Sequence, residues 1–342
     1  MNSLTLADYV HKVQSLIHDS TNSGWSRAEI IRRINDARKD VSLDCQCVRR
    51  LKTGVQLIKG VETYSYDGAV AGAHVVNRGQ NYGERRATVT FTPAPPGGIT
   101  AEAVAHVRQH HHSGHLSHLD EDMPQMVDGQ WDGGLDNDHD DDDEHRIEPG
   151  QIELIRMTRW GKGYTQPPVI TITDPAGTGS GATATPVTML DTINIMSISP
   201  LWNTLLYSLS FKPFTIFQAW ARSLRHQGFR SHPGIYTIHQ GDQLVYVQPT
   251  PVQLFFSEWD VIELAKPLAV LTDIDRDIPD PWAQSVEYKA ASYLLMKMQN
   301  FGQAQYYEGK YDLRVPRIVA GAGGVRIANP YNRSMWEKMR RA

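Results

Sequence analysis

The residues best suited to chemistry gather in one stretch near the middle of the chain. Six of the 14 histidines fall between His106 and His118, and an acidic run then continues to Glu148. Imidazole nitrogens bind transition metals. Four of these histidines are the candidate metal ligands: His110, His112, His115 and His118. No cysteine and no fixed helical spacing supports a metal site, so a solvated polar loop is the plainer interpretation.

Three aspartates within the acidic run, Asp136, Asp138 and Asp140, begin like a calcium-binding loop. Such a loop needs Gly at its sixth position and Glu at its twelfth, where this chain has Asp141 and Ile147. The match to a calcium loop therefore fails, although carboxylates at this density can hold cations loosely. A solvated run of charge is the default interpretation. We predict neither a resident metal nor a cofactor.

The rest of the sequence offers no set of residues typical of an enzyme. The letters GTGSG at 177–181 look like a phosphate-binding loop. No Lys followed by Ser or Thr comes after them, and an alanine-alternating strand stands where a helix is needed. No nucleophile elbow, His-Glu-x-x-His pair or kinase-like set occurs. The sequence favours a protein that is not an enzyme. A metal-dependent enzyme built on the His and Asp segments is the alternative.

The net charge of −4 conceals an asymmetry along the chain. Residues 119–148 contain 13 acidic side chains and one basic side chain. Without that segment the chain has 33 basic and 25 acidic residues, a net charge of +8. A mildly basic body is compatible with a position near DNA.

Length and composition exclude several classes of protein. A chain of 342 residues has room for about two domains. No run of 18 apolar residues occurs, so we expect no membrane span. Asp8 and His11 stand where a secretion signal would need apolar residues. The two cysteines, Cys45 and Cys47, suit neither a structural disulfide nor a zinc site, and we expect free thiols in a reducing cytoplasm.

Helical patterns occupy the two ends of the chain. Thr5 and Asp8 can cap a helix over about 7–19, and Ser26 and Glu29 have capping-box spacing at the start of a second helix. The second helix has an apolar stripe that includes Ile30, Ile31, Ile34, Ala37 and Val41. Two such helices need a third partner, and the helix expected from Pro281 to about residue 300 supplies it. The sequence predicts that Ile30, Ile34 and Leu294 share one core.

The polar side of the second helix is basic. It carries Arg32, Arg33, Arg38 and Lys39. We take these four residues as candidates for contact with a neighbouring subunit or with DNA, and an ordinary solvated face is the alternative.

Between residues 69 and 190 the periodicity changes from helical to alternating. Two segments there share four features in the same order: a Gly-x-x-Tyr turn, an alternating strand, a Pro/Gly turn and an alanine-alternating strand. The turns are Gly79 with Tyr82 and Gly161 with Tyr164. The order indicates an internal repeat of about 80 residues, formed by two copies of one small β unit.

These patterns together predict an α+β fold. A split helical-bundle core with a β-hairpin and strand region takes residues 1–68 and 191–320. A mostly-β insertion takes 69–190 and includes the His-rich and acidic loop 106–148. After a Gly-rich link at 320–324, residues 321–342 form an extended C-terminal tail. Its candidate docking residues are Tyr331, Arg333, Trp336, Lys338, Arg340 and Arg341.

Two stretches carry a resemblance to a known family: WSRAEIIRRINDARKDVSLDCQCVR at 25–49 and NPYNRSMWEKMRR at 329–341. With the mixed segment from 191 and the long helix from Pro281, they resemble the head-to-tail connector (adaptor) proteins of short-tailed bacteriophages. The resemblance covers about the first 65 and the last 150 residues, with motifs of moderate specificity. The insertion departs from the smallest members, and its GKGYTQPP and GSGATA stretches look like a β module of phage structural proteins.

The resemblance implies a virion protein that is assembled in the host cytoplasm and placed at the head–tail junction. Family members form a ring of about twelve copies between the portal and the tail nozzle, and the ring lines the DNA channel. The implied protein partners are further copies of the chain, the portal, the tail nozzle and tail fibre proteins. Packaged DNA passes through the channel without sequence-specific contact, and no membrane partner is implied. Docking on the portal is implied for residues 328–342.

A different function is open for the insertion, which can be a tail-fibre, receptor-binding or glycan-binding module. Its candidate contact residues, if exposed, are Tyr82, Trp131, Trp160 and Tyr164. The plainer interpretation places these aromatic residues in a core or a turn.

Overall fold

The structure is a computed structural model, and it describes residues 4–19, 24–82, 87–108, 149–175, 177–202, 205–226 and 230–324. The chain divides into two compact units. A helical unit combines the two ends, Met1–Arg49 and Glu263–Ala342, and a β unit takes Arg50–Ile262. Each unit has an apolar core of its own.

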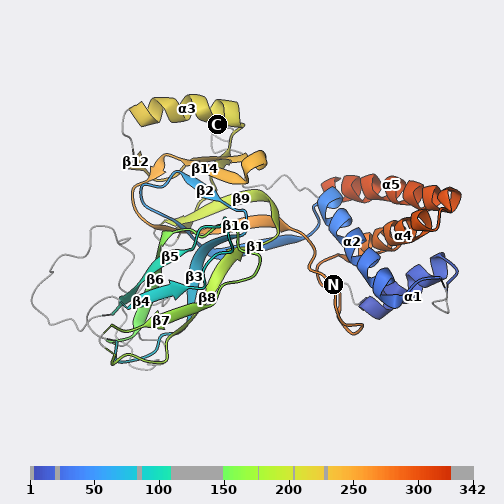
Figure 1. The fold of residues 1–342 in the computed structure, drawn as a ribbon. Helices are drawn as coiled ribbons and strands as arrows, with labels where there is room; N and C mark the ends of the chain where they lie inside the picture. Colours follow the sequence, from blue (N-terminus) through green and yellow to red (C-terminus); the bar gives the residue numbers. More distant parts are fainter. Residues whose placement is uncertain are drawn as a thin grey trace, which may run out of the picture. The chain divides into compact units, whose positions relative to one another are not determined.

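Four helices make up the described part of the helical unit: α1 (Leu6–Leu16), α2 (Arg27–Cys45), α4 (Asp280–Lys297) and α5 (Phe301–Gly324) (Figure 1). Helix α4 contacts each of the other three. Ile30, Ile34 and Leu294 are fully buried in one cluster, which confirms the predicted shared core. Burial of an apolar stripe of this kind contributes about 1.5–3 kcal/mol per large side chain.

The helix starts follow the local signals in the sequence. Thr5 and Asp8 form a complete capping box at α1. Ser26 caps α2 by accepting a hydrogen bond from the Glu29 backbone N–H (3.3 Å), and the Glu29 side chain pairs with Arg33 and Lys297 in place of closing the box. The helix expected from Pro281 begins one residue earlier, at Asp280. Helix α5 continues through 320–324, so the predicted Gly-rich link is helical.

The strands of the β unit outside the repeat form two four-stranded sheets and one short pair. The first sheet has the order β1-β16-β9-β10, the second β11-β13-β14-β2, and β12 pairs with β15. Their bounds are β1 (Arg49–Leu57), β2 (Thr63–Ser65), β9 (Thr192–Trp202), β10 (Leu205–Leu206), β11 (Ser210–Phe211), β12 (Arg230–Ser231), β13 (Ile235–His239), β14 (Leu244–Gln248), β15 (Thr250–Pro251) and β16 (Phe255–Glu263). Helix α3 (Phe214–His226) packs against β13.

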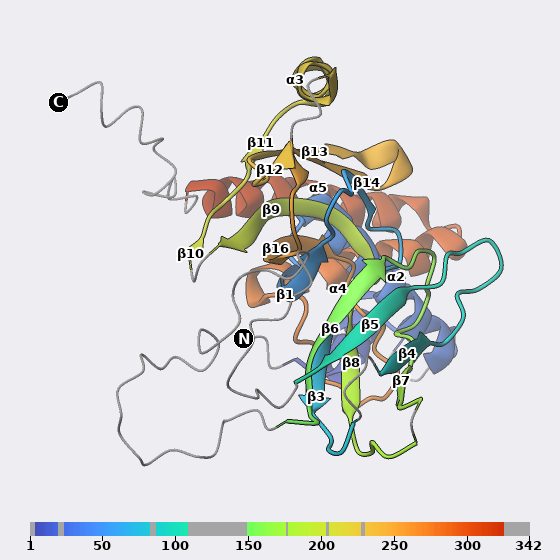
Figure 2. The same cartoon turned by 90° about the vertical axis from the view of Figure 1, so that its left-hand side faces the viewer.

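The two copies of the sequence repeat are interlocked. The first copy supplies β3 (Ala69–Asn77), β4 (Thr88–Phe91) and β5 (Glu102–Val107), and the second supplies β6 (Ile152–Arg159), β7 (Ile170–Thr173) and β8 (Thr183–Met189). The first strand of each copy pairs with the third strand of the other, as β3 with β8 and β6 with β5. The middle strands, β4 and β7, pair with each other. The four strands β6, β5, β4 and β7 follow one another across one sheet (Figure 2).

The tyrosine of each Gly-x-x-Tyr turn accepts a hydrogen bond from the backbone of the other copy of the repeat. The Ala182 backbone N–H donates to the Tyr82 hydroxyl (3.2 Å), and the Ala101 N–H donates to the Tyr164 hydroxyl (3.3 Å). Both tyrosines are buried. The Gly-x-x-Tyr turn is therefore an interlocking element, which accounts for its presence in both copies.

The aromatic residues proposed for glycan contact are mostly buried. Tyr82, Tyr164 and Trp160 lie in the core of the β unit, and Trp131 lies outside the described residues. Trp160 packs against Tyr64 and donates a hydrogen bond to the Gln56 carbonyl (2.8 Å). These three side chains follow the plainer interpretation, burial in a core or turn, and do not form an exposed contact surface.

The predicted helical-bundle core with a strand region is wrong. Strands account for 37% of the structure and helices for 30%. Residues 50–68 and 191–262, which the sequence placed with the helical core, belong to the β unit. The physical reason is a shared interior, because Val245, Val247 and Trp259 pack in the same apolar cluster as the repeat.

The interlocking turn gives a stability prediction. Gly79 has φ +65°, and a Cβ there would lie 2.6 Å from the backbone of both Ala182 and Ser180. Gly97 has φ +86° with open space around it. We expect Gly79→Ala to lower the free energy of unfolding by about 2–4 kcal/mol and Gly97→Ala by about 1 kcal/mol. Urea denaturation measures both values, and equal losses would contradict the close approach at the turn.

Candidate functional site on the helical unit

The four basic residues predicted on the outer side of α2 do not share one environment. Arg32 and Lys39 are exposed. Arg33 is half-buried and forms ion pairs with Glu29 and Asp36, each at 3.2 Å. Arg38 is only 1% exposed. The placement of Arg38 on a contact face is therefore wrong, and of the four predicted residues Arg32 and Lys39 are the exposed ones.

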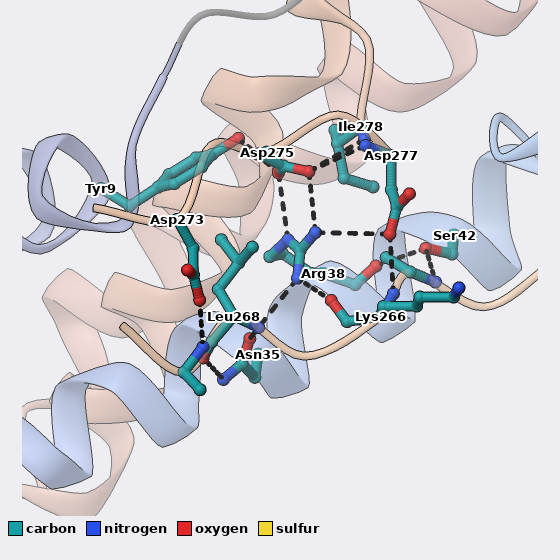
Figure 3. A network of polar contacts seen from close by, with 12 residues as sticks. Tyr9, Asn35, Arg38, Ser42, Lys266, Leu268, Asp273, Asp275, Asp277 and Ile278 are labelled. Atoms are coloured by element: carbon teal, nitrogen blue, oxygen red, sulfur yellow. Dashed lines mark hydrogen bonds and ion pairs between the residues drawn. The ribbon is translucent and has the colours of Figure 1, made fainter. Parts of the chain in front are cut away.

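Arg38 forms a buried bidentate ion pair with Asp275 (Figure 3). Its Nη2 donates to Asp275 Oδ1 at 2.7 Å, and its Nε donates to Oδ2 at 3.0 Å. The third nitrogen, Nη1, donates to the Lys266 carbonyl. Bidentate pairing suits the planar guanidinium and its fixed fork of donors.

The carboxylate of Asp275 is fully buried and is satisfied from several directions. The Tyr9 hydroxyl donates to Oδ2 at 3.1 Å, and the backbone N–H groups of Asp277 and Ile278 donate to Oδ1, each at 3.1 Å. A buried ion pair is tolerated only when its remaining hydrogen-bonding capacity is used in this way.

The ion pair holds the 264–279 segment against α2. Beside Arg38, the Asn35 amide donates to the Leu268 carbonyl and accepts from the Leu268 N–H, both at 2.9 Å. One turn further along, Ser42 Oγ donates to the Arg38 carbonyl (2.7 Å) and accepts from the Ala265 N–H (3.1 Å). The segment that leads into α4 is therefore fixed at three successive points along α2 (Figure 3).

Removal of the guanidinium should be costly because it leaves the Asp275 carboxylate buried without a cation. We expect Arg38→Met to lower the free energy of unfolding by about 3–5 kcal/mol. The matched control is Lys39→Met, which removes the exposed cation next to Arg38 in the sequence. It should change the free energy of unfolding by no more than about 0.5 kcal/mol. Urea denaturation monitored by helical circular dichroism compares the two, and equal effects would exclude the ion pair as a structural requirement.

Helix α5 has two flanks of different character. On the side toward α2 there is a group of carboxylates, three on α2 and one on α5, which we call the carboxylate flank: Asp36, Asp40, Asp44 and Glu308. The hydroxyls of Tyr293 and Tyr311 donate to Asp40 and to Asp44 (2.5 Å for the second). These bonds connect α4 and α5 to α2.

A single lysine lies among the rings of the carboxylate flank. The Lys289 ammonium lies 5.4 Å from the ring centroid of Tyr293 and 4.7 Å from that of Tyr311, and it pairs with Glu308. Ser292 Oγ donates to the other oxygen of Glu308 at 2.7 Å. Cation–π contact and ion pairing together hold Lys289 in place.

Burial, together with the hydrogen bonds to Asp40 and Asp44, raises the pKa of the Tyr293 and Tyr311 hydroxyls well above the ordinary value near 10. A raised phenol pKa stabilises the folded state below pH 10, and this contribution is lost as the pH rises above that value. We expect the free energy of unfolding of the helical unit to fall between about pH 10 and 12. In the double variant Tyr293→Phe/Tyr311→Phe it should fall less per pH unit than in the wild type. Urea denaturation across this pH range measures both slopes, and parallel slopes would contradict the assignment.

The opposite flank of α5 is aromatic and basic. We call it the tyrosine–lysine flank: Tyr288, Tyr306, Tyr307, Lys310 and Arg314. The Lys310 ammonium lies 4.4 Å, 5.3 Å and 5.9 Å from the ring centroids of Tyr306, Tyr288 and Tyr307. A hydrogen bond with Tyr306 raises the pKa of Lys310, so the cation is secure at neutral pH. Tyr288 and Tyr307 are stacked with centroids 6.0 Å apart.

The tyrosine–lysine flank adjoins a shallow pocket between α1, α4 and α5. His11, Lys12 and Arg314 are among the residues that line this pocket. Lys12 pairs with Glu287 at 2.9 Å, and Arg314 Nη2 donates to the Pro281 carbonyl at 3.4 Å. Tyrosine and arginine are the residue types that most often anchor protein–protein contacts. The flank is the candidate docking surface of the unit, and sequence reasoning missed it because its residues are dispersed over two helices.

The other predicted site residues lie outside the described residues. These are the tail residues Tyr331, Arg333, Trp336, Lys338, Arg340 and Arg341, and the candidate metal ligands His110, His112, His115, His118, Asp136, Asp138 and Asp140. In the part of the chain that is described, no group of three or more His, Cys, Asp or Glu residues can hold a metal ion. No helix in that part is both long and apolar enough to cross a membrane.

No model of a known protein family matches the chain, and no curated protein matches it in sequence.

Proposed function

We propose that the chain is a head-to-tail connector of a short-tailed bacteriophage. About twelve copies would form a ring between portal and tail nozzle, line the DNA channel and offer attachment to tail components. The observation that carries the proposal is the single helical core formed by the two ends of the chain. The 25–49 stretch that carries part of the family resemblance forms α2 of this core, and α2 and α4 pack directly against each other. The second stretch, 329–341, lies outside the described residues.

The composition of the C-terminal tail supports a docking role. Helix α5 is packed on α4 and leads directly into residues 325–342. That segment has five basic side chains, one acidic side chain and the aromatic residues Tyr331 and Trp336. Aromatic and arginine side chains are the usual anchors in a partner's groove, and a helix gives such an extension a fixed starting point.

Charge supports contact with DNA that is independent of base sequence. Outside residues 119–148 the chain has a net charge of +8. Arg32 and Lys39 provide exposed cations on α2. Cations of this kind attract the phosphate backbone without reading bases, as passage of a genome through a channel requires.

The proposal predicts that the tail is needed for portal binding. We expect deletion of residues 325–342, which ends the chain at the last residue of α5, to abolish binding to the assembled portal ring. The double variant Tyr331→Ala/Trp336→Ala keeps the basic charge and should weaken binding by about 100-fold through loss of two anchors. Sedimentation with purified portal measures binding. Full-strength binding by the truncated chain would contradict the docking role.

A further inference from the structure

The two flanks of α5 differ in composition and lie within one helical unit. The tyrosine–lysine flank faces α1 and the first turns of α4, where the Tyr307 hydroxyl donates to the Leu16 carbonyl at 3.1 Å. The carboxylate flank faces α2, where Tyr311 donates to Asp44. Helix α5 therefore lies between the tyrosine–lysine flank and the carboxylate flank of the same helical unit.

The tyrosine–lysine flank has unused binding capacity. Tyr306 is 58% exposed, although its ring is held by contact with Tyr307 and Lys310. The Lys310 ammonium lies 4.4 Å from the ring centroid of Tyr306, so a cation and an exposed ring stand side by side. Hydrogen bonds between a cationic donor and a carboxylate are among the strongest that side chains form. The flank is thus prearranged for an acidic partner surface with an apolar component.

The carboxylate flank has the matching properties. Asp36, Asp40 and Asp44 recur every four residues and lie on one side of α2. The Asp36 side chain is 41% exposed and pairs with Arg33 at 3.2 Å, and Asp44 is exposed. Leu43, beside Asp44, is 46% exposed and supplies an apolar contact. The described contacts of Asp40 and Asp44 are with tyrosine hydroxyls, which do not cancel the charge of either carboxylate.

We propose that the tyrosine–lysine flank of one copy binds the carboxylate flank of the next copy. The inference rests on the proposed ring function and assigns the surfaces that build the ring. A cyclic assembly of identical chains joins two different surfaces head to tail, and those surfaces must be complementary. Lys310 and Arg314 meet the aspartates of α2 in this contact, and Tyr306 meets Leu43.

Charge reversal tests the contact. The variant Lys310→Glu/Arg314→Glu alters one flank, and Asp36→Lys/Asp44→Lys alters the other. We expect each double variant alone to weaken self-association by about tenfold or more, and a mixture of the two to recover it, since the reversed flanks attract each other. The matched control, Lys212→Glu/Arg222→Glu, makes the same charge change on the β unit and should associate like the wild type.

Sedimentation velocity over a concentration series provides the measurement, and circular dichroism checks the fold of each variant. The Asp44→Lys change can unfold the chain because Tyr311 loses its hydrogen-bond acceptor. In that case the variant Asp36→Lys/Asp44→Asn takes its place, since the Asn amide oxygen still accepts the hydrogen bond from Tyr311. Wild-type association by Lys310→Glu/Arg314→Glu, a mixture that does not recover, or a wild type that stays monomeric would each overturn the contact.

The portal-binding assay separates this inference from the proposed function. Lys310→Glu/Arg314→Glu keeps the complete tail, so a connector that uses other surfaces to form its ring would associate normally and bind the portal. That result would overturn the flank contact alone. A protein that associates through the flanks but never binds the portal would contradict the connector function and leave the contact intact.

Discussion

The helical unit depends on one buried ion pair. Arg38 and Asp275 are 237 residues apart in the chain, and their bidentate contact connects α2 to the segment that leads into α4. Removing two charges from water is unfavourable. This penalty is offset because Tyr9, the Lys266 carbonyl and two backbone N–H groups complete the hydrogen bonds of the pair. Hydrophobic burial is non-directional, whereas each hydrogen bond of this network needs its partner at a defined distance and angle. The polar contact thus specifies how the two ends of the chain meet.

Local chemistry in the sequence is sufficient to predict the helices of this unit. Thr5, Ser26 and the apolar spacing of Ile30 and Ile34 each act within one or two helical turns. The environment of Arg38 could not be predicted in the same way, because the sequence shows only another cation on a basic helix. One signal was available: Arg38 follows Ile34 by four residues and so lies at the edge of the apolar stripe. Its partner Asp275 lies in a polar loop without periodicity, so its burial depends on tertiary structure.

In the β unit, too, local patterns could be predicted from the sequence, whereas contacts between distant segments could not. The repeat was visible because Gly79 with Tyr82 and Gly161 with Tyr164 occur in equal turns. The interlocking was not visible, because strand pairing between copies is a long-range property. The hairpin of β13 and β14 was placed with the helices for a related reason. Its alternating pattern shows that one face is buried, but it does not show which interior buries that face.

The docking surfaces of α5 follow from the packing of α4 at the centre of the helical unit. Contact with α4 on one side leaves α5 with two lateral flanks, and residues of α1, α2 and α4 complete them. Neither flank is a continuous motif, so spacing along one helix could not reveal it. Native mass spectrometry of the chain bound to assembled portal tests the connector function most directly. The proposal predicts a closed ring of about twelve copies. A complex that contains a trimer would contradict it and favour a tail fibre or spike.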